Sequence, residues 1–249
     1  MESLAGRIPP EAVQRLRESK RLVVLTGAGV SAESGVPTFR GKEGLWKNHR
    51  PEQLATPQAF EKDPELVWDW YHWRRNTVRE ASPNPAHYAI AELERKIPAF
   101  ALVTQNVDGL HLRAGSEKVL EIHGDLHHAR CSKCSDVVAL EEQAGLVICE
   151  LCGGHMRPNV VWFGENLDVR LLEEAFVASR ASDFLIVAGT SNIVQPAASL
   201  AYEALGNNGY VLEINLDPTP LTGSASATVL GKAGEILGEL VKMAWPEEH

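Results

Sequence analysis

Short apolar runs, separated by segments with helical spacing, make up most of this chain. Four runs rich in β-branched or aromatic residues stop at glycine or polar residues, as buried strands do, at 22–25, 99–104, 183–190 and 209–215. A shorter run at 119–123 predicts a further strand that ends in a histidine. Apolar residues at helical spacing predict helices at 10–20, 64–80, 171–179 and 197–205, and a last helix that begins near 234. Strands that alternate with helices predict an α/β fold with a parallel, doubly wound sheet.

The first predicted strand ends in a glycine-rich run from Gly27 to Ala32. Its spacing, G-x-G-x-x-A, is the looser form of a dinucleotide-binding turn, in which glycines let the backbone approach a pyrophosphate. An ordinary glycine-rich turn explains the run equally well. No strand ending in an acidic residue follows about 20 residues later, which argues against a dehydrogenase. Gly35 and Pro37 interrupt any helix here, so residues 33–46 are predicted to form a loop over the nucleotide.

Polar residues also follow the other predicted strands. Gln105, Asn106 and Asp108 follow the second strand, and His123 ends the short one. A Gly-Thr-Ser turn at 189–191 follows the third. Open α/β sheets bind their ligands at the carboxyl ends of strands, so these residues are candidates for a site. Taken alone, His123 is better explained as a hydrogen-bonded core histidine.

The segment at 43–83 differs in composition from the rest of the chain. It holds four tryptophans and a tyrosine among charged residues: Trp46, Trp68, Trp70, Tyr71 and Trp73. Because residues 64–80 have helical periodicity, most of these rings are predicted to belong to a core.

Composition and charge narrow the function classes. The 249 residues, 44% of them apolar, are enough for one large domain or for one domain with an insert. A net charge of −9 argues against a protein that binds nucleic acid through its phosphates, although a local basic pocket remains compatible with it. We expect no membrane binding and a cytoplasmic location, because the sequence shows no run of 18 apolar residues and no signal-peptide pattern.

All four cysteines lie in one segment, as two C-x-x-C pairs separated by 14 residues: Cys131, Cys134, Cys149 and Cys152. This spacing is typical of a four-cysteine zinc site. Two disulfides or redox-active pairs are the alternatives, and a cytoplasmic location disfavours the disulfides. With four protein ligands no position is left for substrate, so one structural zinc ion is predicted.

A zinc ribbon can also be a nucleic-acid-binding module. The ribbon from Cys131 to Cys152 contains one lysine, Lys133, against four acidic residues, Asp136, Glu141, Glu142 and Glu150. It therefore offers no basic surface, and no direct nucleic-acid binding is expected.

Taken together in this order, the glycine loop, the polar strand end, the histidine, the cysteine pairs and the Gly-Thr-Ser turn resemble the sirtuins. These are NAD-dependent protein-lysine deacylases, and the resemblance covers residues from about 22 to 237. It implies a Rossmann-like NAD-binding domain made of 1–42, 84–125 and 159–249. A smaller domain would consist of a helical insert at 43–83 and a zinc-ribbon insert at 126–158. The active site would lie in the cleft between the two domains.

The resemblance implies a set of NAD contacts that spans the chain. The residues that match the family's nucleotide-binding positions are Gly27, Ala28, Gly29, Ser31, Phe39, Arg40, Trp46, Gln105, Asn106, Asp108, Gly189, Thr190, Ser191, Asn215, Leu216, Asp217 and Ala233. Asn192 and Gln195 depart from the family's pattern after the Gly-Thr-Ser turn. The late position of the ribose contact, Asn215 to Asp217, accounts for the missing acidic residue after the first strand.

The resemblance also implies the reaction. In the family, the acyl-lysine carbonyl oxygen attacks NAD as nicotinamide leaves, a ribose hydroxyl then attacks the imidate so formed, and water completes the release. The products are nicotinamide, O-acyl-ADP-ribose and free lysine. His123 matches the general base, and an unperturbed imidazole, which titrates near about pH 6.5, is largely free to accept a proton at neutral pH. Protein mono-ADP-ribosyl transfer is the alternative reaction with the same cofactor.

Acylated lysines of proteins or peptides are the partners that the resemblance implies. The segment that matches the family's peptide-pairing strand contains Val160, Val161, Phe163, Gly164 and Glu165. A strand edge binds peptides through main-chain hydrogen bonds, so selectivity for the peptide sequence should be loose.

The choice of acyl group is predicted from Tyr71 and Arg74, which lie three apart on a predicted helix and so share one face. In isolation, Tyr71 would pack with the tryptophans and Arg74 would be a solvated charge. With the small Ala55 upstream, the pair resembles the sirtuin class that accepts acidic acyl groups. We therefore expect succinyl-, malonyl- or glutaryl-lysine to be preferred over acetyl-lysine, which should also be hydrolysed.

Overall fold

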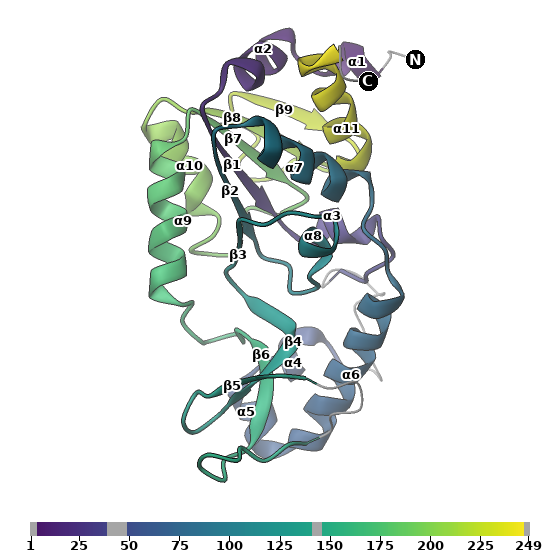
Figure 1. Cartoon of the computed structure of the whole chain (residues 1–249), viewed down its shortest axis with the longest axis vertical. Helices are drawn as coiled ribbons and strands as arrows, with labels where there is room; N and C mark the ends of the chain where they lie inside the picture. The colour runs from purple at the N-terminus through teal and green to yellow at the C-terminus, as the bar shows by residue number, and fades with distance from the viewer. Residues whose placement is uncertain (1–3, 39–48, 141–145, 247–249) are drawn as a thin grey trace.

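The computed structural model describes residues 4–38, 49–140 and 146–246, and its larger sheet has six strands (Figure 1). Their order is β3-β2-β1-β7-β8-β9, and every neighbouring pair is parallel. The strands are β1 (Arg21–Thr26), β2 (Ala99–Thr104), β3 (Val119–Glu121), β7 (Phe184–Ala188), β8 (Tyr210–Asn215) and β9 (Ala227–Leu230). The predicted parallel, doubly wound sheet is confirmed.

Helices cover both faces of this sheet (Figure 1). One layer contains α1 (Leu4–Arg7), α2 (Pro10–Glu18), α7 (Pro85–Lys96) and α11 (Ala233–Ala244), and the other contains α9 (Val169–Ala181) and α10 (Ser199–Gly206). Strand β1 serves both cores, since Leu22 and Val24 pack on the first layer while Val23 and Leu25 pack on the second. A strand buried on both faces reads as a continuous apolar run, which is why the sequence pattern located it.

The smaller sheet is antiparallel, with the order β5-β4-β6. It consists of β4 (Gly124–Cys131), β5 (Val137–Ala139) and β6 (Met156–Val160). Beside it lie α4 (Pro51–Leu54), α5 (Pro57–Lys62) and α6 (Pro64–Glu80) (Figure 1). All of these elements except β5 contribute to one apolar cluster, in which the indole N–H of Trp68 donates to the Met156 carbonyl at 3.1 Å. The domain boundaries stated above stay a prediction.

Helix α6 has the predicted bounds, and its rings form the predicted core. Trp68, Trp70 and Tyr71 are buried, and Trp73 is half-buried. Asp63 caps the helix by accepting from the Leu66 N–H at 2.9 Å. Trp46 lies outside the described residues.

The sequence pattern did not predict every element of the larger sheet and its helical layers. Helix α7 and strand β9 fall in segments for which no element was predicted. In addition, β3 ends at Glu121, so His123 lies in the turn that follows the strand. The predicted strand end at His123 is therefore wrong by two residues.

Two short helices follow the ends of β1 and β2. They are α3 (Ala28–Ala32) and α8 (Leu110–Arg113), and both lie on the side of the larger sheet that faces the smaller one (Figure 1). Helix α3 stops after five residues and a turn follows, as the sequence predicts. Of the predicted loop at 33–46, the part beyond residue 38 lies outside the described residues. Within those residues no helix has the length and apolarity needed to cross a membrane.

Candidate functional site

The order of the strands changes direction between β1 and β7. From β1 the chain proceeds outward to β2 and β3, and from β7 it proceeds in the opposite direction to β8 and β9. Such a switch point is where open α/β sheets bind ligands, outside the carboxyl ends of the strands. The two predicted glycine turns follow these two strands.

The glycine turns touch each other through their backbones. The Gly29 N–H donates to the Gly189 carbonyl at 2.8 Å, and the Gly27 N–H donates to the Ala188 carbonyl at 3.1 Å. A Cβ on Gly29 would lie 2.7 Å from the Gly189 oxygen, and one on Gly27 would lie 2.7 Å from the Thr190 Cβ. Gly189 also has a φ of 60°, which favours glycine. The glycines therefore allow the two turns to meet at the switch point.

Three predicted nucleotide contacts form a buried chain of hydrogen bonds. The Asn106 amide donates to the Gly27 carbonyl at 3.0 Å and to the Ser31 hydroxyl at 2.9 Å. The Ser31 hydroxyl donates to the Asp108 carboxylate at 2.6 Å, whose other oxygen accepts from the Leu110 N–H. The structure thus brings these residues together, with the Asp108 carboxylate already engaged by donors of the protein.

Thr190 connects the ends of three strands. Its hydroxyl accepts from the Gln105 amide at 2.9 Å, and its carbonyl accepts from the Asn215 amide at 2.8 Å. Gln105, Thr190 and Asn215 follow or end β2, β7 and β8 respectively. The predicted contacts from these strands therefore form one wall.

The remaining predicted nucleotide contacts are less uniform. Leu216 and Asp217 are exposed beside Asn215, and Ser191 is half-exposed. Ala233 is buried in the core of the larger sheet, so its methyl group packs inward at the start of α11. Phe39, Arg40 and Trp46 lie outside the described residues.

A buried carboxylate that the sequence pattern did not single out fixes the turn after β7. Glu213 is fully buried and accepts from the hydroxyls of Thr219, Thr222 and Thr228 and from the Asn192 amide. Asn192, which departs from the family's pattern, has a φ of 53° and bonds inside the protein. A single acidic residue in the apolar run of β8 was the available signal.

His123 is held in one tautomer. Its Nδ1 lies 3.0 Å from the Gln105 carbonyl oxygen, which can only accept, so Nδ1 carries the proton and Nε2 has the free lone pair. Burial lowers the pKa of His123 below 6.5, and the bond to Gln105 opposes this in part. The imidazole is therefore neutral at pH 7 and able to accept a proton.

The turn that carries His123 is fixed to the smaller sheet. Gly124 has a φ of 79°, and a Cβ there would lie 2.0 Å from the Asn159 carbonyl oxygen. The Val161 N–H donates to the His123 carbonyl at 2.9 Å. The first contact requires a glycine at position 124, and the second is a hydrogen bond between two backbones. Together they fix the position of His123 between the two sheets.

Two further histidines lie behind the Asp108 chain and were assigned no role from the sequence. The rings of His87 and His111 are buried with centroids 4.7 Å apart. Burial lowers the pKa of His87 to about 4 and that of His111 to about 3. Nε2 of His111 lies 3.0 Å from the Thr26 hydroxyl at the end of β1. Both histidines are therefore neutral at pH 7, and the pair packs against the end of β1 through His111 and Thr26.

The predicted peptide-pairing strand is wrong beyond Val160. Strand β6 ends at Val160, and the residues that follow form a loop in which Gly164 has a φ of 86°. The Glu165 N–H donates to the Trp162 carbonyl at 3.0 Å, which closes a turn. Phe163 is half exposed, and its N–H donates to the Ala55 carbonyl at 2.9 Å. That the segment binds peptide stays a prediction.

Glu165 holds this loop through a buried arginine. Its carboxylate accepts hydrogen bonds from both terminal nitrogens of Arg157, at 2.5 and 2.9 Å, and from the Trp162 backbone N–H at 2.8 Å. Burial alone would raise the pKa of Glu165, but the bonds from Arg157 and Trp162 outweigh it and lower the pKa. Arg157, a charged residue in an apolar strand, was not recognised from the sequence.

Tyr71 and Arg74 converge, as the helix spacing predicts. The Arg74 guanidinium lies 5.6 Å from the Tyr71 ring centre and 5.1 Å from that of Trp70. Burial lowers the pKa of Arg74, while the neighbouring Tyr71 and Asp108 and a hydrogen bond to Tyr71 act in the opposite direction. The interpretation of Arg74 as a solvated surface charge is therefore wrong. Ala55 is buried in the same apolar cluster as Tyr71.

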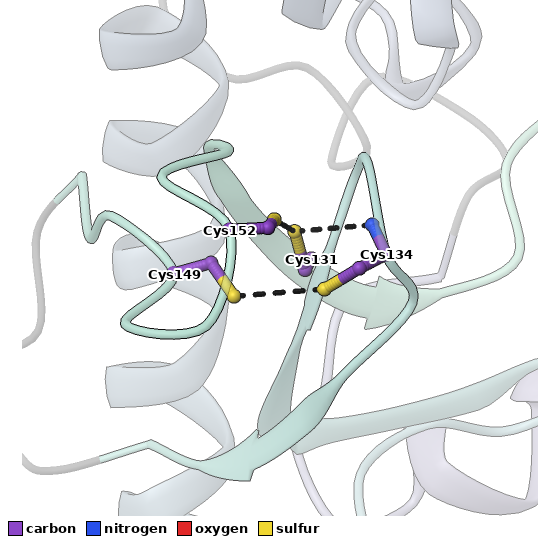
Figure 2. Close-up of side chains that lie close together, drawn as sticks. All are labelled: Cys131, Cys134, Cys149 and Cys152. Carbon is purple, nitrogen blue, oxygen red and sulfur yellow. Dashed lines mark hydrogen bonds between the residues drawn. The ribbon is translucent and has the colours of Figure 1, made fainter.

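The four cysteines converge on one point (Figure 2). All Sγ atoms lie within 4.8 Å of one another, with Cys131 and Cys152 at 3.4 Å and Cys134 and Cys149 at 3.7 Å. These separations exclude disulfides, whose sulfurs lie about 2.05 Å apart. Four sulfurs bound to one tetrahedral zinc ion at about 2.3 Å would lie about 3.8 Å apart. The donor set therefore fits one zinc ion.

Comparisons with known proteins agree with this geometry. The model of the Sir2 family matches residues 27–196. A protein of Archaeoglobus fulgidus named NAD-dependent protein deacylase 1 is 53% identical over 92% of this chain and 95% of its own length. The NAD-dependent protein deacylase of Thermus thermophilus is 54% identical over 96% of each chain.

Solved structures give the same result. A Sir2 homologue in complex with NAD has a TM-score of 0.91 and 51% identity, over 95% of this chain and 94% of its own. A Sir2 complex with a p53 peptide and NAD has a TM-score of 0.84 and 34% identity, over 94% and 97%. The family match across the two glycine turns, the histidine and the cysteines, together with this identity along nearly the whole length, shows that the chain belongs to the Sir2 family.

Proposed function

We propose that this protein is an NAD-dependent protein-lysine deacylase. The observation that carries the proposal is the position of His123. Its turn connects strand β3 of the larger sheet to β4 of the smaller sheet, and its ring is bonded to Gln105 at the end of β2. The names of its relatives support the reaction, and the complexes of its structural neighbours with NAD and with a peptide support the two substrates.

NAD would be held by residues at the ends of β1, β2, β7 and β8. Gly27, Gly29 and Gly189 contribute no side chain where the two turns touch, and Thr190 and Asn215 add polar groups next to them. Acidic residues do not dominate this wall, which suits a ligand with a pyrophosphate. When bound, NAD supplies a ribose carbon that becomes electrophilic as nicotinamide leaves.

His123 would act as the general base. Its Nδ1–H is committed to the Gln105 carbonyl, so proton transfer must occur at Nε2. Removing a proton from a ribose hydroxyl converts that hydroxyl into a nucleophile for the acyl carbon. Because burial holds the pKa of His123 below 6.5, the base is in its active form at neutral pH.

The loop that follows β6 would bind the peptide. Its backbone is fixed from below by Glu165 and Arg157, and its exposed side chain is Phe163. Backbone contacts of this kind leave the peptide sequence loosely specified. A zinc ion held by the four cysteines would be structural. The cysteines lie at the end of β4 and in the segments between the strands of the smaller sheet, and Cys131 and Cys149 belong to its apolar cluster.

The acyl group would be chosen by Arg74 and Tyr71. A guanidinium can take a carboxylate in a two-pronged contact, and the small Ala55 leaves room for a longer chain. Tyr71 is fully buried and Arg74 is partly exposed, so an acidic acyl chain would approach from the side of Arg74. We therefore propose that succinyl-, malonyl- or glutaryl-lysine is hydrolysed with a higher kcat/KM than acetyl-lysine.

Replacement of Arg74 by methionine tests this choice. We expect the acidic substrate to lose roughly 1.5 to 3 kcal/mol of transition-state stabilisation, the range for a hydrogen bond to a charged group. Acetyl-lysine turnover should change little. The measurement is kcat/KM on matched succinyl- and acetyl-lysine peptides, with Arg79→Met on the exposed face of the same helix as control. Equal losses on both peptides would mean that Arg74 supports the fold or the NAD site.

The reaction itself is tested by product analysis. Acylated peptides and NAD, incubated with the protein, should yield free lysine, nicotinamide and O-acyl-ADP-ribose in equal amounts by mass spectrometry. ADP-ribose that stays attached to protein would instead establish mono-ADP-ribosyl transfer. If no acyl peptide gave an NAD-dependent product, the deacylase proposal would be wrong and the alternative of a binding module would be favoured.

A further inference from the structure

We infer that Trp162 is a positioning residue for acyl selectivity, because its indole N–H fixes the direction of the Tyr71 hydroxyl. This inference rests on the proposed deacylase function and deepens it. The indole Nε1 donates to the Tyr71 oxygen at 2.8 Å, across 91 positions of the sequence. Trp162 is 2% exposed and Tyr71 is fully buried, so no water competes for this bond.

The bond decides where the Tyr71 proton can go. A phenol has one proton to donate and lone pairs to accept with, whereas an indole N–H and a guanidinium only donate. The neighbours of the Tyr71 oxygen are the Trp162 N–H and the Arg74 guanidinium, and both are donors. Within the part of the chain that the structure describes, the Tyr71 hydroxyl proton therefore has no acceptor.

A buried hydroxyl proton without an acceptor is costly, and a ligand that brings an acceptor relieves that cost. A carboxylate placed against Arg74 supplies such an acceptor. The methyl end of an acetyl group does not. Because the Trp162 N–H donates to the Tyr71 oxygen, the phenol proton points away from the indole. The proton is therefore already oriented to donate to an acidic acyl chain when that chain binds.

Trp162 is itself held rigidly. The Arg157 guanidinium stacks on its ring at 3.3 Å, and the Phe60 ring lies against it at 5.4 Å between centroids. Its backbone N–H is bound by Glu165, which also pairs with Arg157. The loop that would bind the peptide is thus tied directly to the hydroxyl that would contact the acyl group.

The test uses the full-length protein and a matched pair of variants. Trp162→Phe keeps an aromatic ring but removes the N–H at Tyr71. Trp68→Phe removes an equally buried indole N–H that donates to the Met156 carbonyl instead. Affinity is measured by fluorescence anisotropy with labelled succinyl- and acetyl-lysine peptides, and kcat/KM is measured on the same peptides with NAD.

We expect Trp162→Phe to lower the succinyl-to-acetyl ratio about fivefold in both measurements, the effect of about one hydrogen bond. Trp68→Phe should leave the ratio at the wild-type value, even if both variants lose stability. In a Tyr71→Phe background, Trp162→Phe should change the ratio no further, because the hydroxyl that it positions is gone.

Three results would overturn the inference. They are an unchanged ratio in Trp162→Phe, an equal fall in Trp68→Phe, and an additive effect in the Tyr71→Phe background. Each leaves the deacylase proposal intact as long as the wild-type protein releases lysine in an NAD-dependent manner. If it releases none, the peptide-binding arm still reports whether Trp162 controls the preference.

Discussion

Replacement of Cys149 by serine is expected to abolish zinc binding and to unfold the smaller sheet. Structural zinc contributes apparent binding free energies of about 10–16 kcal/mol in small zinc modules, which is as large as the whole unfolding free energy of an ordinary domain, about 5–15 kcal/mol. Cys149 is 3% exposed and packs in the same apolar cluster as Trp68 and Met156. Loss of the metal would therefore spread to the helix that carries Tyr71 and Arg74.

Metal analysis and thermal unfolding test this expectation together. The wild-type protein should contain one zinc ion per chain, and Cys149→Ser should contain none and unfold at a lower temperature. Lys133→Ala, an exposed change in the same knuckle that removes no sulfur, is the control and should keep its zinc. Pure, active wild-type protein without zinc would contradict the assignment.

The elements that the sequence predicted best are those with a strong local signal. Helix α6 begins with Asp63 and Pro64, a cap and a residue suited to the first turn, and its large rings make the period visible. Strand β1 is buried on both faces and therefore reads as an unbroken apolar run.

The elements that were not predicted have weak side-chain signals. In α7 several buried positions are alanines, which mark a core face poorly, although the Asn84 cap and Pro85 were a usable sign of a helix start. Strand β9 is the last strand at one edge of the sheet and only Val229 in it is buried, so it lacks an apolar run. Burial set by tertiary contacts, and not local pattern, determines both elements.

In the candidate site, too, features with a local sequence signal were predicted and features set by long-range contacts were not. Residue types at strand ends predicted which side chains gather at the switch point, because parallel strands end at a common edge. The contact of Trp162 with Tyr71 joins segments 91 positions apart, and the acceptor role of Glu213 depends on three separate threonines. Spacing in one sequence carries no information on such long-range pairs. The loop after Val160 was misjudged because Arg157 and Glu165 end the strand through an ion pair.

Replacement of His123 by alanine is expected to lower kcat/KM for deacylation by at least about 100-fold, the usual scale for the loss of a general base. Zinc content and the unfolding temperature should stay near wild type, because among the described residues the side chain makes one hydrogen bond, to the Gln105 carbonyl. The other side of the ring, Nε2, is the proton acceptor that the reaction would lose. His155→Ala removes an exposed imidazole and serves as the control.

The pH profile separates this role from a structural one. A base must be deprotonated to act, and burial holds the pKa of His123 below 6.5, so wild-type kcat/KM should stay level from pH 8 to pH 7. It should fall only as the pH drops through that lowered pKa, where the imidazole becomes charged. The residual activity of His123→Ala should lack this fall, because the titrating base is absent. Near-normal turnover in the variant, or an unchanged acid limb, would remove His123 from the mechanism and assign proton transfer to another group.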